Sequence, residues 1–103
     1  MKKLFISQPM RDKAPEEIEA VRESATQTIE ELIGEKIEVI DSYFKDEYAK
    51  TNNPLTCLGK SIQLLGEADI VYFVKGWDNV RGCRIEYLCA TQYGIDVIIE
   101  EEQ

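Results

Sequence analysis

Residues 76–86 carry the groups best suited to chemistry, because one carboxylate, Glu86, stands near the start of a helical pattern. The segment follows an apolar run, residues 70–74, which predicts a buried strand. Glycines at positions 76 and 82 indicate a loop that joins the end of this strand to the helix. In open α/β sheets, small ligands bind at such junctions. We therefore expect a ligand site around Glu86.

Glu86 has two interpretations. In the first, the positive N-terminal end of the helix stabilises its carboxylate, which acts as a nucleophile or as a ligand for sugar hydroxyls. In the second, Glu86 is a surface side chain that pairs with Arg81 or Arg84. Spacing alone favours the second interpretation.

A second candidate segment follows the first apolar run and consists of Ser7, Gln8, Pro9, Met10 and Arg11. Backbone N–H groups and the Ser7 hydroxyl at such a loop can hold phosphate or ribose oxygens, and Arg11 can pair with a phosphate. The alternative interpretation of the same residues is a capped turn with a solvated arginine. The glycine-rich dinucleotide fingerprint and the P-loop are both absent from the sequence.

Two further residues of the Glu86 segment suit a ligand. Trp77, the single tryptophan, is able to stack on a base or line a pocket; in the alternative interpretation it covers the end of the sheet. Gly82 allows a ligand to approach the backbone closely, or it makes a tight turn into the helix.

The composition bounds the class of protein. The chain has 103 residues, of which 44% are hydrophobic and 31% charged, which is typical of one folded domain spanning residues 1–103. Its formal net charge of -8 disfavours binding to nucleic acid polymers. That charge still permits one small anionic ligand held by local arginines.

Membrane and metal functions are not indicated. No apolar run approaches the roughly 20 residues of a membrane span, and the apolar part of the start is too short for a signal peptide. Cys57, Cys83 and Cys89 form no C-x-x-C pair, and histidine is absent. We therefore expect a cytoplasmic protein with reduced thiols, Cys89 in the core, and neither a metal site nor a cofactor. Without histidine, Ser–His and Cys–His catalytic dyads are excluded.

Apolar runs alternate with helical patterns along the whole chain, and Pro15, Pro54 and several glycines mark the helix ends. The expected strands are residues 2–6, 37–40, 69–74 and 95–99, and the expected helices are residues 15–33, 54–65 and 81–93. The expected buried stripes of these helices are Ile18, Val21, Ala25, Ile29, Leu32 and Ile33; Leu55, Leu58, Ile62 and Leu65; and Ile85, Leu88 and Cys89.

This alternation predicts an α/β fold, a shortened flavodoxin-like, Rossmann-like three-layer sandwich. Single helices between strands imply right-handed crossovers, and so about four parallel strands in the order 2-1-3-4. The topological switch point then lies between the first and third strands. It brings together residues 7–13 and 75–86, with the long connection 41–53 as a lid or wall.

That connection holds Tyr43, Phe44 and Tyr48. These aromatic side chains are suited either to walling the pocket or to meeting a neighbouring subunit. The second use would make the protein a homo-oligomer.

Several of these segments together resemble a known family. Residues 5–11, 66–70, 76–77 and 82–86 are similar to motifs of the nucleoside 2-deoxyribosyltransferase-like superfamily, and most similar to its small DUF4406 branch. The resemblance implies a Rossmann-like fold, a homo-oligomer whose site a neighbouring subunit completes, and a nucleoside or nucleotide ligand. It also implies that Glu86 attacks the anomeric carbon of the sugar, and that water or a second base resolves the glycosyl-enzyme intermediate.

Two departures from the family pattern bear on catalysis. The relatives carry an aspartate on the helix before the third strand, where this chain has Ser61 or a residue next to it. They also carry serine or aspartate six residues before the glutamate, where this chain has Val80. Asp78 and Asn79 lie close by and could substitute for that group.

Three functions therefore compete. The first is a nucleoside or nucleotide N-glycosidase or deoxyribosyltransferase, with Glu86 as nucleophile and Asp12, Asp41 and Asp78 as possible proton donors. Its substrate contacts would be Ser7, Asp78 and Gly82 to the sugar, Arg11 to a 5′-phosphate and Trp77 to the base. The second is a non-catalytic binder, a sensor or sequestering protein, of a nucleotide-derived small molecule. The third is an interaction domain built on the aromatic connection.

Overall fold

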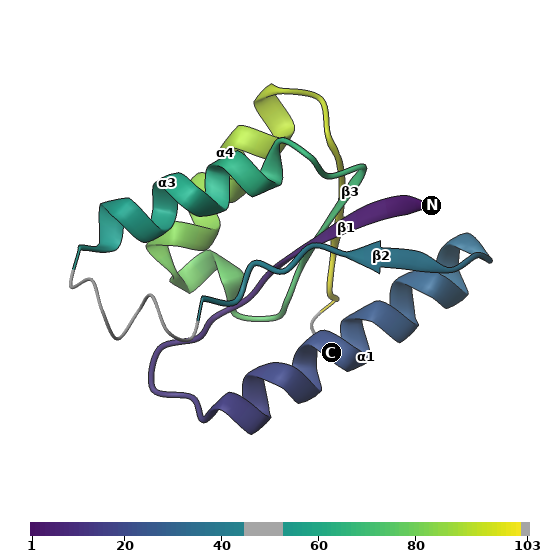
Figure 1. The fold of residues 1–103 in the computed structure, drawn as a ribbon, viewed down its shortest axis with the longest axis horizontal. Coiled ribbons are helices and arrows are strands. Elements are labelled where there is room, and N and C mark those ends of the chain that lie inside the picture. The colour runs from purple at the N-terminus through teal and green to yellow at the C-terminus, as the bar shows by residue number, and fades with distance from the viewer. Residues whose placement is uncertain (45–52, 102–103) are drawn as a thin grey trace.

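The computed structural model describes residues 1–44 and 53–101 (Figure 1). In chain order its elements are β1 (Lys2–Ser7), α1 (Pro15–Ile33), β2 (Ile37–Val39), α3 (Pro54–Leu65), β3 (Ile70–Phe73), the 3₁₀ turn η1 (Trp77–Asn79), α4 (Arg81–Gln92) and β4 (Asp96–Ile99). The strands form one parallel sheet in the order β2-β1-β3-β4. The fold is therefore the small Rossmann-like α/β sandwich that the sequence predicts.

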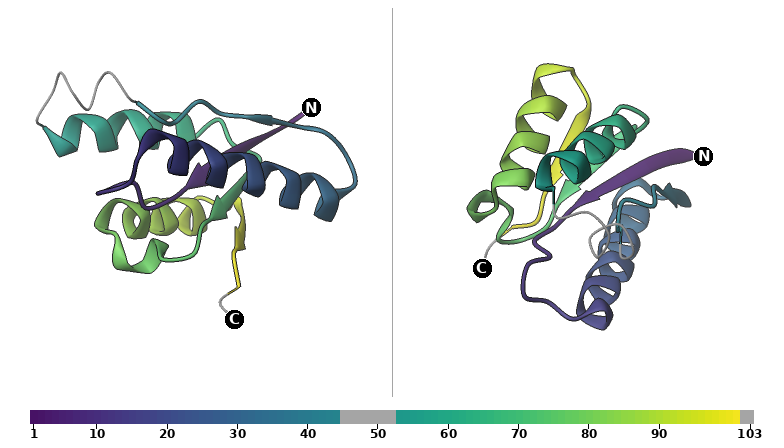
Figure 2. Two further views of the ribbon diagram at one scale, coloured as in Figure 1. Left: turned by 90° about the horizontal axis from the view of Figure 1, so that it is seen from below. Right: turned by 60° about the vertical axis from the view of Figure 1, so that its left-hand side comes forward.

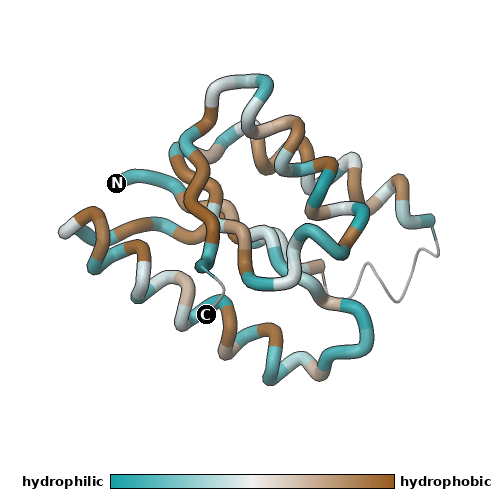
Figure 3. Tube along the Cα trace, turned by 180° about the vertical axis from the view of Figure 1, so that it is seen from behind, coloured by the Kyte–Doolittle hydropathy of each residue, from teal (hydrophilic) through white to brown (hydrophobic). Residues whose placement is uncertain are grey.

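The sheet separates two cores, because successive strand side chains point to opposite faces. Helix α1 lies on one face, where Ala25 and Ile29 pack with Leu4 and Ile6. Helices α3 and α4 lie on the other face, where Leu65 and Ala90 pack around Phe5, Val71 and Phe73 (Figure 2). The apolar residues gather along the central strands in Figure 3.

The helix ends follow local chemistry. Pro15 opens α1, and the Glu17 carboxylate accepts a hydrogen bond from the Ala14 N–H at 3.4 Å. Gly34 ends α1 with φ of 72°, a left-handed conformation that favours glycine. Asn53 begins α3 by accepting a hydrogen bond from the Leu55 N–H at 3.0 Å.

Three leucines expected in buried stripes are exposed, which corrects the sequence prediction. Leu32, Leu55 and Leu88 are 64%, 74% and 57% exposed. Leu32 and Leu55 lie in the outermost turns of their helices. On α4 the buried residues are Cys83, Glu86 and Ala90, so Leu88, about 200° around the helix from Glu86, faces solvent.

The element boundaries differ slightly from those predicted. β1 extends to Ser7, which pairs with Phe73 of β3, whereas β2 ends at Val39. β3, β4 and α4 are shorter than expected by one or two residues at their ends, where assignments vary. Tyr48 lies outside the described residues, while Tyr43 and Phe44 are half-buried. Within the described residues, no helix combines the length and apolar character that a bilayer crossing requires.

Arg22 of α1 ties together the carboxyl ends of β1 and β2. Its guanidinium donates hydrogen bonds to Gln8 Oε1 at 3.0 Å, to the Ile40 carbonyl at 3.0 Å and to Ser42 Oγ at 3.2 Å. Burial lowers the pKa of Arg22, and the nearby Asp41 carboxylate partly offsets this effect. The loops at this edge of the sheet are therefore fixed by one side chain.

We expect Arg22→Ala to lower the free energy of unfolding by roughly 2–4 kcal/mol, because three hydrogen bonds are lost and their acceptors are left unpaired. Urea denaturation measures this loss. Arg81→Ala removes an exposed arginine from α4 and is the matched control. Equal losses of unfolding free energy in the two variants would contradict the conclusion that Arg22 holds the loops after β1 and β2 in place.

Candidate functional site

Glu86 and Ser7 form the centre of the candidate site, although 79 residues separate them in the sequence. The Ser7 hydroxyl donates a hydrogen bond to Glu86 Oε1 across 2.7 Å. Both side chains are buried, with only 8% of Glu86 and 2% of Ser7 exposed. A carboxylate and a hydroxyl therefore meet at the carboxyl edge of the sheet, where the sequence placed the site.

Strand pairing and helix geometry position these two groups. Ser7 is the last residue of β1 and pairs with Phe73 at the end of β3, so both strands end at the same level. The chain then passes through η1 into α4, whose buried face presents Cys83 and Glu86 one turn apart. The odd-numbered side chains of β1, Phe5 and Ser7, point toward that face.

The surface interpretation of Glu86 is wrong. Among the described residues, no ion pair includes Glu86. Arg84 instead donates a hydrogen bond to the Asp78 carbonyl at 3.1 Å, and Arg81 is exposed. Packing of α4 against the sheet overrides the spacing argument, because Glu86 falls on the same helix face as Cys83 and Ala90.

Burial changes the acidity of Glu86. Desolvation raises the pKa of its carboxyl from 4.5 to about 7, while hydrogen bonds with Ser7 and Ser61 act in the opposite direction. The Glu86 carboxyl therefore exchanges its proton close to neutral pH instead of at its ordinary acidic pH.

Cys83 is the third buried group of the site, with 4% of its surface exposed. Burial raises the pKa of its thiol to about 11; a hydrogen bond with Ser7 lowers it and the Glu86 charge raises it further. The thiol therefore keeps its proton at neutral pH. Cys83 was not among the site residues predicted from the sequence, although its position three residues before Glu86 places both on one helix face.

Ser61 of α3 also belongs to the site, because its hydroxyl acts on Glu86 and lowers the pKa of that carboxyl. Ser61 was not among the site residues predicted from the sequence, where it stands at or next to the position at which the resembled family carries an aspartate. Val80, six residues before Glu86, supplies no polar side chain and instead stands at the N-cap of α4.

The other predicted residues of the first loop lie around this centre. Gln8 points to the opposite face of the sheet, where its amide donates a hydrogen bond to the Ile18 carbonyl at 3.3 Å and accepts one from Arg22. Pro9 lies against Gly76, so the loops after β1 and β3 lie side by side. Met10 is half-buried, and Arg11 is exposed.

Trp77 packs against the protein itself. Its ring stacks on Tyr87 with centroids 4.7 Å apart and lies 5.1 Å from the ring of Phe73. It thus covers the end of the sheet, while staying partly exposed beside the loop. Asp78 and Asn79 are exposed in η1.

Gly82 lies within the first turn of α4 and needs no special backbone conformation there. A Cβ added at Gly82 would meet no atom within 4 Å, so the space beside its backbone is open.

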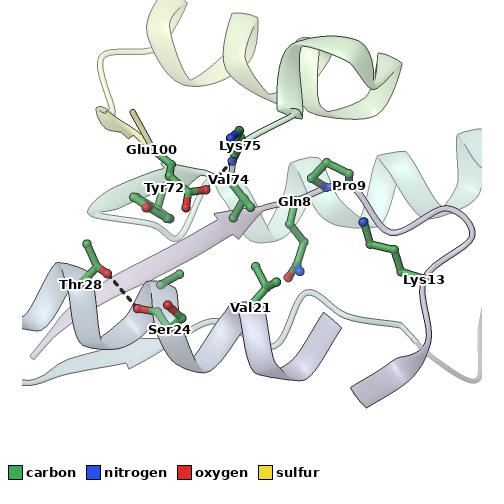
Figure 4. A pocket seen from close by; sticks show the side chains of 11 residues that line it. Gln8, Pro9, Lys13, Val21, Ser24, Thr28, Tyr72, Val74, Lys75 and Glu100 are labelled. Atoms are coloured by element: carbon green, nitrogen blue, oxygen red, sulfur yellow. Dashed lines mark hydrogen bonds between the residues drawn. The ribbon is translucent and has the colours of Figure 1, made fainter. Parts of the chain in front are cut away.

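A separate cavity of about 280 Å³ opens on the α1 side of the sheet (Figure 4). Val21 and Ser24 of α1 face Tyr72 and Val74 of β3 across it, and Gln8 reaches into it from above. Because Ser7 points to the other face, this cavity does not include Glu86. Within the described part of the chain, no three histidine, cysteine or acidic side chains are grouped as metal ligands.

Comparison with known proteins adds no relative: no family model matches the chain, and no curated protein matches it either.

Because the Glu86 carboxyl is buried, we expect the free energy of unfolding to depend on pH. The pKa of Glu86 is higher in the folded state, about 7, than the ordinary 4.5, so the folded protein loses stability as pH rises between these values. We expect Glu86→Gln to raise the free energy of unfolding by up to about 3 kcal/mol above pH 7, and by little near pH 4.5.

Thermal unfolding at several pH values measures this gain. Glu38→Gln, which changes an exposed glutamate of β2, is the control and should show no such dependence. A Glu86→Gln gain that stayed constant across the pH range would show that Glu86 is not a desolvated carboxyl.

Proposed function

We propose that the protein cleaves or transfers the N-glycosidic bond of a nucleoside or nucleotide, with Glu86 as the nucleophile. The observation that supports this most is the buried Glu86 carboxylate, fixed by Ser7 at the switch point between β1 and β3. Ligands of doubly wound sheets bind at this edge. The substrate class rests on the resemblance of the motifs around Ser7 and Glu86 to the deoxyribosyltransferase-like superfamily.

The proposed reaction has two steps. An ionised Glu86 oxygen attacks the anomeric carbon, the carbon–nitrogen bond breaks, and the base nitrogen keeps the bonding electrons and takes a proton from water. The resulting glycosyl ester is then attacked at the same carbon by water or by a second base, which restores the carboxylate and releases a proton. Two inversions at one carbon give net retention.

The residues around Glu86 have distinct tasks in this proposal. Ser7 and Ser61 hold the carboxyl by hydrogen bonds, and they favour its ionised, nucleophilic form. The open space beside Gly82 admits the sugar. The exposed Arg11 is available for a 5′-phosphate. The half-exposed edge of Trp77 is available for the base.

One observation favours a second candidate function, a non-catalytic binder of a nucleotide-derived small molecule. Burial raises the pKa of Glu86 to about 7 and so favours its protonated form, and a protonated carboxyl is a hydrogen-bond donor and a poor nucleophile. Such a site would hold a sugar hydroxyl through Glu86 and Ser7 without cutting the glycosidic bond.

Release of free base decides between the two functions. We expect wild type to release base from at least one member of a panel of ribo- and deoxynucleosides and their 5′-monophosphates, with and without an acceptor base. Glu86→Ala should lower this rate by a factor of 10³ or more, on the order of the loss expected for a nucleophile. Chromatography separates the products.

Glu38→Ala is the matched control and should retain the wild-type rate. Base release that is unchanged in Glu86→Ala would overturn the proposed nucleophile. A panel that raises the melting temperature of the wild type without any release would establish the binder instead.

The rate should follow the ionisation of Glu86. Because only the ionised carboxyl attacks carbon, we expect kcat/KM to rise with pH and level off above about 7, the pKa of Glu86. Initial rates measured across this range test the expectation. A rate that is independent of pH, or that falls as pH rises through 7, would contradict nucleophilic attack by Glu86.

A further inference from the structure

The cavity between α1 and β3, here called the α1-side cavity, is a second place in the molecule where a ligand fits. Val21, Ser24 and Thr28 of α1 form one wall, and Tyr72 and Val74 of β3 form the other (Figure 4). Its volume of about 280 Å³ lies just below the range of about 300–1,000 Å³ that is usual for ligand pockets. A matching ligand is therefore a small molecule, well below the size of a dinucleotide.

Two lysines give the lining of this cavity a positive charge. Lys13 lies in the loop between β1 and α1, and Lys75 lies in the loop after β3. Among the described residues, no ion pair includes either lysine. Glu100 also lines the cavity, and its carboxylate accepts a hydrogen bond from the Lys75 backbone N–H at 2.6 Å. Two lysines against one glutamate leave a local net charge of +1 in a chain of net charge -8, which favours an anionic ligand here.

The same cavity offers hydrogen-bonding groups that suit hydroxyls. Gln8 is only 6% exposed, and two hydrogen bonds with residues of α1 hold its amide in place. The Thr28 hydroxyl donates to the Ser24 carbonyl at 3.0 Å, which leaves lone pairs on its oxygen that can accept from a ligand. The Glu100 carboxylate is a further acceptor. A ligand that carries several hydroxyls therefore finds partners on both walls.

We propose that the α1-side cavity binds a small polyhydroxylated anion, which is a sugar acid or a sugar phosphate. Lys13 and Lys75 attract its anionic group, and Thr28 and Glu100 accept hydrogen bonds from its hydroxyls. This site is separate from that of Glu86, because α1 and α4 cover opposite faces of the sheet. The proposal does not depend on the proposed function.

Titrations followed by ¹H–¹⁵N spectra of the whole chain test this site. The probes are gluconate, glucose 6-phosphate and neutral glucose, each added up to about 10 mM, which detects even weak specific binding. We expect at least one of the two anions to shift the amide signals of Ser24, Thr28 and Lys75 to saturation. Glucose should shift them far less. The anion that binds more tightly shows whether the site prefers a carboxylate or a phosphate.

Three results of these titrations would overturn the proposal. The first is that neither anion shifts the three amide signals. The second is that glucose binds as tightly as the anions, because the lysines then play no part. The third is that the shifts gather around Gly82 and are lost in Glu86→Ala, because the probe then occupies the other face of the sheet. None of these results would contradict Glu86 as a nucleophile.

A double substitution of the two lysines tests the charge directly. We expect Lys13→Gln combined with Lys75→Gln to weaken binding of the anion by roughly 3- to 30-fold, the range for two exposed ion pairs. Lys2→Gln combined with Lys36→Gln is the matched control, because it changes the net charge equally at exposed lysines outside the cavity. The control should bind like the wild type. Equal affinities in the two double variants would overturn the assignment of Lys13 and Lys75 to the site.

Discussion

The hydrogen bond from Ser7 to Glu86 is the constraint on which the candidate site depends. It spans 2.7 Å and connects the end of β1 to the first turns of α4 across the top of β3. It forms only if β1 and β3 end at the same level, which their parallel register ensures. It also requires that Glu86 lie on the buried face of α4, together with Cys83 and Ala90. The site therefore depends on the register of β1 with β3 and on the rotation of α4 about its own axis.

Burying this carboxyl costs stability, and the surrounding residues reduce the cost without removing it. The hydroxyls of Ser7 in β1 and Ser61 in α3 offset part of the desolvation of Glu86, and no ion pair of the described residues includes this carboxyl. A residue selected for packing alone at this position would be apolar. This arrangement is typical of a functional site, where a group with a shifted pKa lowers the stability of the folded protein. On the opposite face of the sheet, the partly buried Arg22 donates its hydrogen bonds to neutral acceptors, which are Gln8, the Ile40 carbonyl and Ser42.

Much of the fold follows from the sequence, because continuous apolar runs such as residues 70–74 mark parallel strands, and prolines and glycines mark the helix ends. The strand order then follows from crossover handedness. The rotation of α4 does not follow, since the stripe containing Leu88 and the one containing Cys83 and Glu86 both have helical spacing, and only packing chooses between them. The proximity of Ser61 to Glu86 could not be predicted from the sequence either, because it depends on how α3 and α4 pack against each other. The prediction that the segments containing Ser7 and Glu86 meet at the carboxyl edge of the sheet is confirmed, because both segments follow the ends of neighbouring strands.

The acidity of Glu86 is the most direct test of this account. Carboxyl ¹³C chemical shifts of protein labelled at glutamate can be followed across pH, with the Glu86 resonance assigned by its loss in Glu86→Gln. A buried carboxyl beside the hydroxyls of Ser7 and Ser61 should titrate with a midpoint of about 7. A midpoint near the ordinary 4.5 would show that Glu86 is solvated, and would contradict the buried site on which the proposed chemistry depends.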